Sequence, residues 1–226
     1  GYISAGRLVA RTQNAFEAMS SMERHRGHFY NWYDTQSLAP LEPRYISSVD
    51  SGNLAGHLLT LRPGLLALPD TPILPPQTFH GLRNTLELMA GVGPVAQQAA
   101  ITRLQKALDE ACDSPPATVA AGRLILDRLG AEGRALAAAL ATVSDGHEAQ
   151  RWAAALAAQC ADFCDDLAAL APWTSVGASA APHVHLPGFT GNPTLAELAA
   201  LDGEWGAPAR ARIASINRLA AQTIDF

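Results

Sequence analysis

The chain has 226 residues, 48% of them apolar, so it can bury a sizeable core as one large domain or two small ones. Its formal charge of −5 carries no long run of one sign, and without clustered basic residues nucleic acid is not an expected partner. No uninterrupted apolar run is long enough to span a bilayer, so we expect a soluble segment with no direct membrane span.

The chain opens with a predicted amphipathic helix over residues 4 to 24, in which apolar side chains recur at helical spacing. Ser4 can cap this helix, and Gly27 is expected to end it. The β-prone aromatic run after Gly27 is closed by turn-forming residues, and a second β-prone run follows at residues 44 to 49. This pattern predicts a short β-hairpin near residues 28 to 48.

The rest of the chain predicts a helical array, which gives a mainly α fold of about seven or eight helices in all. Asp50 or Ser51 can cap the second helix, and Pro63 and Pro69 are expected to interrupt or end it. Further helices, rich in Ala, Leu, Arg and Glu, are predicted at 77–90, 94–113, 115–143, 145–170, 194–201 and 208–223, with a Pro/Gly/Ser loop at 171–193.

Three cysteines, Cys112, Cys160 and Cys164, cannot form an even disulfide framework, so free thiols in a reducing compartment are predicted. Cys160 and Cys164 are four residues apart in a helical stretch, where they are expected to be buried small apolar groups. The chain lacks an initiator methionine and stops directly after a helical pattern, so we expect a piece of a longer protein.

Aromatic and polar residues are concentrated at residues 27 to 58, whereas the remainder is mostly Ala and Leu. Strand alternation would place Trp32 and Asp34 on one side and Asn31 and Tyr33 on the other. One side could then form part of the core while the other faces a cleft.

A polar group follows at the start of the second predicted helix. Asp50, Asn53 and His57 fall on one helical face there. Aromatic rings beside Asp, Asn and His suit a sugar, whose C–H faces stack on rings while its hydroxyls need donors and acceptors. The structural alternative is that the aromatic residues plug a helix junction and the Asp residues only cap turns and helices.

Two other kinds of site are weighed. Asp34 and Asp50 could form the general acid and base of a glycosidase if their carboxyl groups lay across a glycosidic bond. His183 and His185 have chelate-like spacing, but their loop holds no nearby Cys or carboxylate cluster, so we predict no metal site.

The stretch "RHRGHFYNWYDTQSLAPLEPRYISSVDSGNLAGHLLTL", at residues 24 to 61, closely resembles a segment of the bacterial cyclic β-1,2-glucan synthases. Ile46 and Ser48 stand where that family usually has Val and Thr, and both changes are conservative. The positions that match the family pattern are Gly27, His28, Asn31, Trp32, Tyr33, Asp34, Tyr45, Ser47, Asp50, Ser51, Gly52 and Asn53.

The resemblance implies a very large inner-membrane protein with a glycosyltransferase region that uses UDP-glucose, a glucoamylase-like cyclisation region and a phosphorylase-like region. This chain would be the N-terminal part of the cyclisation region, with partial (α/α)6-barrel-like character. It would be one helical region over 1–226, with a family-like segment at 1–69 and a variable segment at 70–226. The segment itself would be on the cytoplasmic side.

The resemblance also defines the expected site. The catalytic acidic residues for transglycosylation are expected after Phe226, and Asp34 and Asp50 are the candidates within the chain. The expected partners are a β-1,2-glucan chain and other domains of the same polypeptide, and no cofactor is expected in this segment. The residues expected to bind glucan are Asn31, Trp32, Tyr33, Asp34, Tyr45, Asp50 and Asn53.

Two alternative functions stay open from the sequence. The Ala-rich helices of residues 77 to 170 suit a non-catalytic scaffold that joins the membrane glycosyltransferase and phosphorylase-like regions. The chain could also be a small independent glycosidase that uses Asp34 and Asp50.

Overall fold

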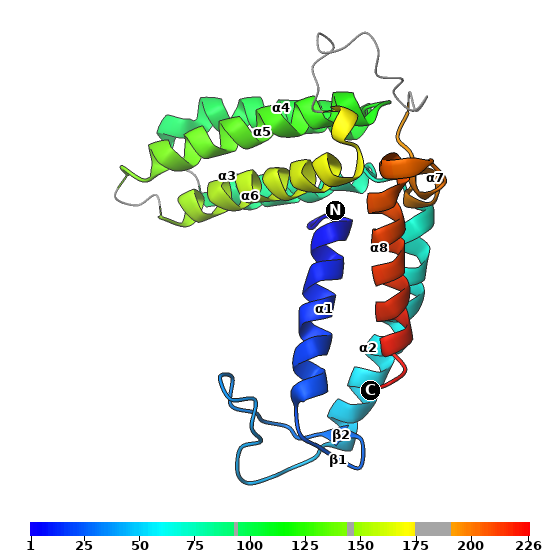
Figure 1. Ribbon diagram of the computed structural model, residues 1–226. Coiled ribbons are helices and arrows are strands. Elements are labelled where there is room, and N and C mark those ends of the chain that lie inside the picture. The colour runs from blue at the N-terminus through cyan, green and yellow to red at the C-terminus, as the bar shows by residue number, and fades with distance from the viewer. Residues whose placement is uncertain (93–94, 144–146, 175–190) are drawn as a thin grey trace.

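The computed structural model describes residues 1–92, 95–143, 147–174 and 191–226. Helices dominate it and form two groups that lie at an angle to each other (Figure 1). One group contains α1 (Ala5–Ser21), α2 (Ser48–Ala67) and α8 (Gly203–Gln222). The other contains α3 (Gln77–Val92), α4 (Gln98–Asp113), α5 (Val119–Leu140) and α6 (His147–Leu170).

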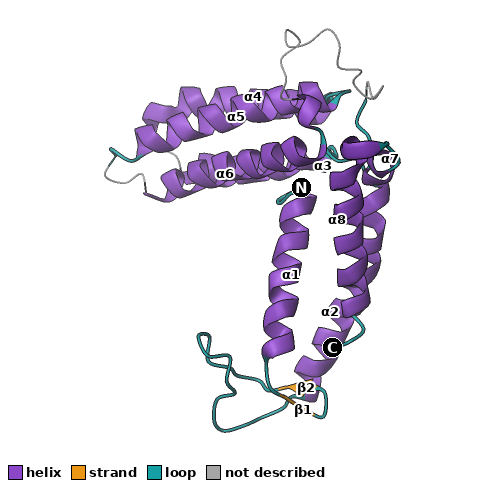
Figure 2. Ribbon diagram, viewed as in Figure 1, coloured by secondary structure: helices purple, strands orange, loops and turns teal. Residues whose placement is uncertain are grey.

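Short helical elements lie between or beside these helices. The helix α7 (Leu195–Ala199) packs against α8, and single 3-10 turns cover Leu68–Asp70, Val95–Gln97 and Pro172–Thr174. In the part of the chain that the structure describes, strand is confined to the lower end of α1 and α2, as Figure 2 shows. The mainly α array predicted from the sequence is therefore confirmed, and its barrel-like closure stays a prediction.

Several helix boundaries differ from the predicted ones. Ser4 caps α1 as predicted, by accepting a hydrogen bond from the Arg7 amide, but α2 is capped by Ser47 and not by Asp50 or Ser51. Pro63 neither ends nor breaks α2, which continues to Ala67. Likewise, α8 begins at Gly203 and runs through the proline at which a helix start was predicted. Most of the predicted loop at 171–193 lies outside the described residues.

The predicted hairpin exists but lies earlier in the chain. Strand β1 (Arg24–His25) pairs antiparallel with β2 (His28–Phe29). Its two-residue turn has positive φ at both Arg26 (53°) and Gly27 (88°), which is the type I′ geometry that matches strand twist. Gly27 therefore forms this turn, and α1 has already ended at Ser21.

Residues 44 to 49 do not form the returning strand that was predicted. Between β2 and α2, the antiparallel pairing is a single bridge between Tyr33 and Pro40. The main chain closes around it, because Leu41 donates to the Trp32 carbonyl at 3.0 Å. The segment between β2 and α2 is therefore mostly a folded loop.

Each helix group has its own apolar core. Phe79, Leu86 and Leu126 are fully buried in the α3–α6 group. Phe16 and Ile216 lie in the α1–α2–α8 core. Among the described residues, no helix combines the length and apolarity needed to cross a bilayer.

The prediction of free cysteines is confirmed, while the reducing compartment stays a prediction. Cys112, Cys160 and Cys164 are free, and the last two are buried where α5 packs on α6. They serve as small core residues of the α3–α6 group.

Candidate functional site

A cavity of about 430 Å³ lies between the hairpin and the first turns of α2. Arg26, Gly27, His28, Phe29, Tyr30 and Asn31 form its hairpin side. Asp50, Ser51, Leu54, Ala55 and Leu58 form its α2 side, and Phe226 closes it from the far end of the chain. Aromatic and apolar surface therefore meets a carboxylate, a hydroxyl and an imidazole in one open cavity.

Aromatic packing between distant parts of the chain explains why the hairpin faces α2. Phe29 and Phe226 pack with ring centroids 6.3 Å apart, and Phe226 also packs on Phe16 of α1 at 5.2 Å. The Arg24 guanidinium lies 5.4 Å from the centre of the Phe29 ring. These contacts hold β2 against the bundle of α1, α2 and α8, so the turn projects beside the start of α2.

Asn31 connects the hairpin to α2. Its side-chain amide donates to Asp50 Oδ2 at 2.8 Å, and its Oδ1 accepts from the Ser47 amide at 2.9 Å. Its own backbone amide donates to the Tyr45 carbonyl at 2.9 Å. On the opposite wall, His28 Nδ1 lies 3.1 Å from Ser51 Oγ. Polar groups of the cavity are thus linked to one another across the two elements.

Trp32 and Tyr45 form a stacked pair outside this cavity. Their ring centroids are 6.1 Å apart at an interplanar angle of 29°. The exposed fractions are 51% for Trp32 and 54% for Tyr45, which is high for such large apolar side chains. The pair gives the loop a second aromatic surface, separate from the cavity walls.

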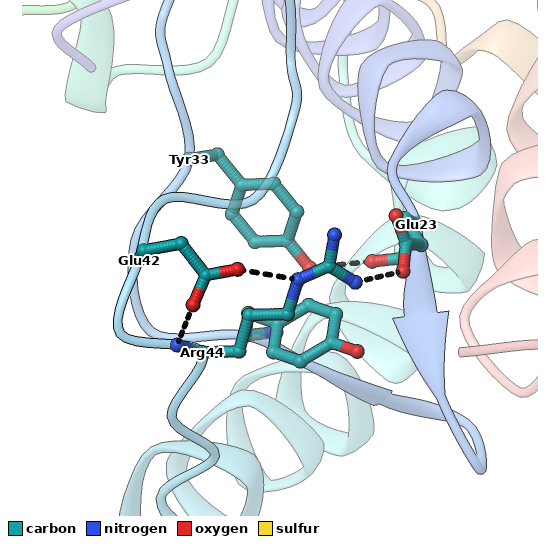
Figure 3. Close-up of polar contacts among 5 residues, drawn as sticks. Glu23, Tyr33, Glu42 and Arg44 are labelled. Carbon is teal, nitrogen blue, oxygen red and sulfur yellow. Dashed lines mark hydrogen bonds and ion pairs between the residues drawn. The ribbon is translucent and has the colours of Figure 1, made fainter.

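A charged network holds the loop to the end of α1, as Figure 3 shows. Arg44 contacts Glu23 at 2.7 Å and Glu42 at 3.1 Å. Tyr33 donates its hydroxyl hydrogen to the Glu23 carbonyl at 2.7 Å and accepts from the Tyr30 amide at 2.8 Å. Tyr33 therefore supports the loop with its hydroxyl group.

Asp34 is engaged in a tight turn. Its Oδ1 accepts hydrogen bonds from the backbone amides of Gln36 and Ser37 and from the Ser37 hydroxyl, at 2.7 to 3.1 Å. Hydrogen bonding from Ser37 and Gln36 stabilises the charged carboxylate and lowers the pKa of Asp34. Asp34 is not among the residues that line the cavity.

The structure thus divides the predicted site. Asn31 and Asp50 lie together at the cavity, whereas the other five predicted glucan-binding residues do not line it. The predicted strand alternation is wrong, because β2 ends at Phe29 and consecutive residues from His28 to Asn31 all line the cavity.

Three residues that line the cavity, Leu54, Leu58 and Phe226, were not predicted from the sequence, for two different reasons. Leu54 and Leu58 follow Asp50 at helical spacing, so the sequence could have predicted that they share one face of α2 with Asp50. The predicted face with Asn53 and His57 was the neighbouring one. Phe226 is far away in sequence, and no local pattern indicates that it reaches the cavity.

No metal centre is found in the described part of the chain, since it holds no group of three or more His, Cys, Asp or Glu side chains suited to an ion. The two histidines weighed for zinc, His183 and His185, lie outside the described residues.

Comparison with known proteins bears on the family. No protein-family model matches the chain. Over 138 residues, or 61% of its length, the chain is 36% identical to the cyclic beta-(1,2)-glucan synthase NdvB of Rhizobium meliloti (strain 1021). The chain is related to the cyclic β-1,2-glucan synthases. The resemblance predicted from its sequence is thereby confirmed.

The extent of the match is itself informative. It spans 4% of the length of NdvB, so this chain corresponds to a small part of that synthase. Because 138 residues exceed the length of segment 1–69, the similarity also takes in part of the helical segment at 70–226. The division between a family-like and a variable segment stays a prediction.

Proposed function

We propose that this chain forms part of a glucan-contacting surface in a cyclic β-1,2-glucan synthase. The observation that carries the proposal is the 430 Å³ cavity, which is built from the family-like stretch in a chain related to NdvB. In the parent synthase, glucose would be transferred from UDP-glucose to the growing chain, and transglycosylation in the cyclisation region would then close the ring.

The chemistry of the cavity supports contact with a sugar. Phe29 and Phe226 offer apolar rings, while Asp50, Ser51 and His28 offer acceptors and donors for hydroxyl groups. The outward Trp32–Tyr45 pair can stack on the C–H face of a further glucose unit. Such contact needs no cofactor.

The chemical step is proposed to belong to residues of the synthase outside this chain. The carboxylate of Asp34 is committed to its own turn, and the carboxylate of Asp50 receives the Asn31 amide. Both groups therefore have positioning tasks that account for their presence. In this proposal the segment lies on the cytoplasmic side of the inner membrane and packs against other domains of the same polypeptide.

The direct test is a calorimetric titration of the 226-residue chain with linear β-1,2-glucan oligomers. We expect saturable binding, which Trp32→Ala weakens roughly fivefold, as loss of about 1 kcal/mol of stacking predicts. Tyr2→Ala is the matched control, because Tyr2 is similarly exposed but lies beside α3, where its hydroxyl meets Asn84. In the intact synthase, Trp32→Ala and Asp34→Asn should also reduce ring closure.

A chain that is folded by circular dichroism yet binds no oligomer would contradict glucan contact. That result would favour the scaffold function instead, for which the independently packed α3–α6 core gives the structural basis. Equal loss of affinity in Trp32→Ala and Tyr2→Ala would place binding away from the loop.

A further inference from the structure

We infer that Asn31 is a positioning residue that sets the Trp32–Tyr45 pair and the Asp50 carboxylate in a fixed relation for glucan contact. The inference rests on the proposed function, and it changes the role of Asn31 from a sugar ligand to a support. Both ends of the Asn31 side-chain amide already contact the protein itself.

The first support is that Asn31 makes protein contacts with both ends of its side-chain amide and with its backbone amide. The side chain gives one N–H to Asp50 and takes one from Ser47, while the backbone amide donates to the Tyr45 carbonyl. These three bonds, at 2.8 to 2.9 Å, join the end of the hairpin to three residues, two of them before α2 and one inside it. Both ends of the side-chain amide are therefore engaged by the protein, which leaves one N–H and one oxygen lone pair.

The second support is that the amide orientation follows from chemistry. The Ser47 backbone group is a donor and the ionised Asp50 carboxylate is an acceptor, so only the carbonyl of Asn31 suits Ser47 and only its NH2 suits Asp50. A flipped amide would lose both bonds. Aspartate or alanine at this position would therefore lose one or both contacts in a defined way.

The third support is where these contacts lead. Ser47 is the N-cap of α2 and accepts from the Asp50 amide at 3.1 Å, so the Asn31 bond to Ser47 acts on the first turn of α2. In the other direction, Asn31 immediately precedes Trp32 and holds the main chain of Tyr45. One residue thus connects both halves of the stacked pair to the cavity wall that carries Asp50.

The test compares Asn31→Ala with Asn31→Asp in the 226-residue chain. Asn31→Ala should accelerate hydrogen exchange of the Ser47 amide and weaken binding of β-1,2-glucan oligomers at least roughly fivefold, the effect of one lost hydrogen bond. Asn14→Ala is the control, since Asn14 is an exposed asparagine of α1 that does not line the cavity. It should leave both quantities unchanged.

Asn31→Asp provides a signature that simple loss of stability would not give. The variant keeps the acceptor for Ser47 but sets a second carboxylate against Asp50, which raises the pKa of one of the two. Binding should be weak at neutral pH and should recover as the pH is lowered, because a proton shared by the two carboxylates restores the donor. Arg26, His28 and Tyr30 also line the cavity and carry ionisable groups. The glucan affinity of the wild-type chain is therefore measured over the same pH range, and its pH dependence is subtracted.

Outcomes separate this inference from the proposed function. Wild-type exchange at Ser47 together with wild-type affinity in Asn31→Ala would overturn the positioning role. A wild-type chain that binds no glucan would contradict the proposed function, while Ser47 exchange and the NMR signal of the Trp32 indole would still decide whether Asn31 orders the loop. An Asn31→Asp profile without recovery at low pH would contradict the contact with Asp50.

Discussion

The Asp166 carboxylate and the Arg212 guanidinium form an ion pair of 2.7 Å where α6 meets α8. The exposed side-chain fractions are only 9% and 18%. The other oxygen of Asp166 accepts from the Gly6 amide at 3.0 Å, and a Cβ at Gly6 would collide with this carboxylate. One carboxylate therefore ties the first turn of α1 to both groups of helices.

Loss of this carboxylate should be costly. Asp166→Ala leaves a largely buried guanidinium and the Gly6 amide without their acceptor, so we expect the free energy of unfolding to fall by about 3 kcal/mol. Asp162→Ala is the matched control, because its 3.8 Å ion pair with Arg7 is more exposed and should contribute less than about 1 kcal/mol. Urea unfolding measures both, and equal losses would contradict a special role for Asp166.

Two helical glycines should respond to alanine with opposite signs. A Cβ at Gly206 would collide with the Leu201 carbonyl, so Gly206→Ala should destabilise the chain by about 1 to 3 kcal/mol. Gly56 in α2 has open space around it, so Gly56→Ala should stabilise the chain by about 0.5 to 1 kcal/mol through helix propensity. Thermal unfolding should show a lower Tm for the first and a higher Tm for the second. A common sign would contradict the close approach at Gly206.

The helices were predictable because their signals are local. Apolar spacing and Ser4 as a cap predict α1 to within a few residues. The start of α2 was misplaced because Asp50, Ser51 and Ser47 are all good caps, and the choice depends on the bond that Asn31 makes to the Ser47 amide. A capping rule that considers only neighbouring residues takes no account of a side chain 16 residues away.

The site was predictable in composition but not in geometry. The aromatic and polar stretch does carry the cavity, and Asn31 and Asp50 do meet there. The strands were misplaced because of Arg26. A residue other than glycine is uncommon at positive φ, so the sequence did not indicate a type I′ turn at Arg26 and Gly27. Phe226 enters through tertiary packing alone.

The hydrogen bonds in the Asp34 turn should be detectable as a lowered pKa of the Asp34 carboxyl group. The pKa of Asp34 is lowered in the folded chain by hydrogen bonds from Ser37 and Gln36, so the turn is stabilised above the ordinary pKa of about 3.9. This contribution is lost as pH falls through the lowered folded value. Carbon-detected NMR should give a pKa below the ordinary value for Asp34 and a value closer to ordinary in Ser37→Ala. A wild-type pKa at or above the ordinary value would exclude these bonds.

The buried cysteines should resist alkylation in the folded chain. Burial raises the pKa of Cys160 and of Cys164 to about 12, and the Cys164 thiol also donates to Asp127 at 3.3 Å. At pH 8 only roughly one thiol in ten thousand would then be the reactive thiolate. Peptide mapping after iodoacetamide treatment should find Cys112, which is only partly buried, modified first, and the other two only after unfolding. Cys112→Ser should remove the early label. Equally fast labelling of Cys164 in the native chain would show that α5 and α6 separate readily.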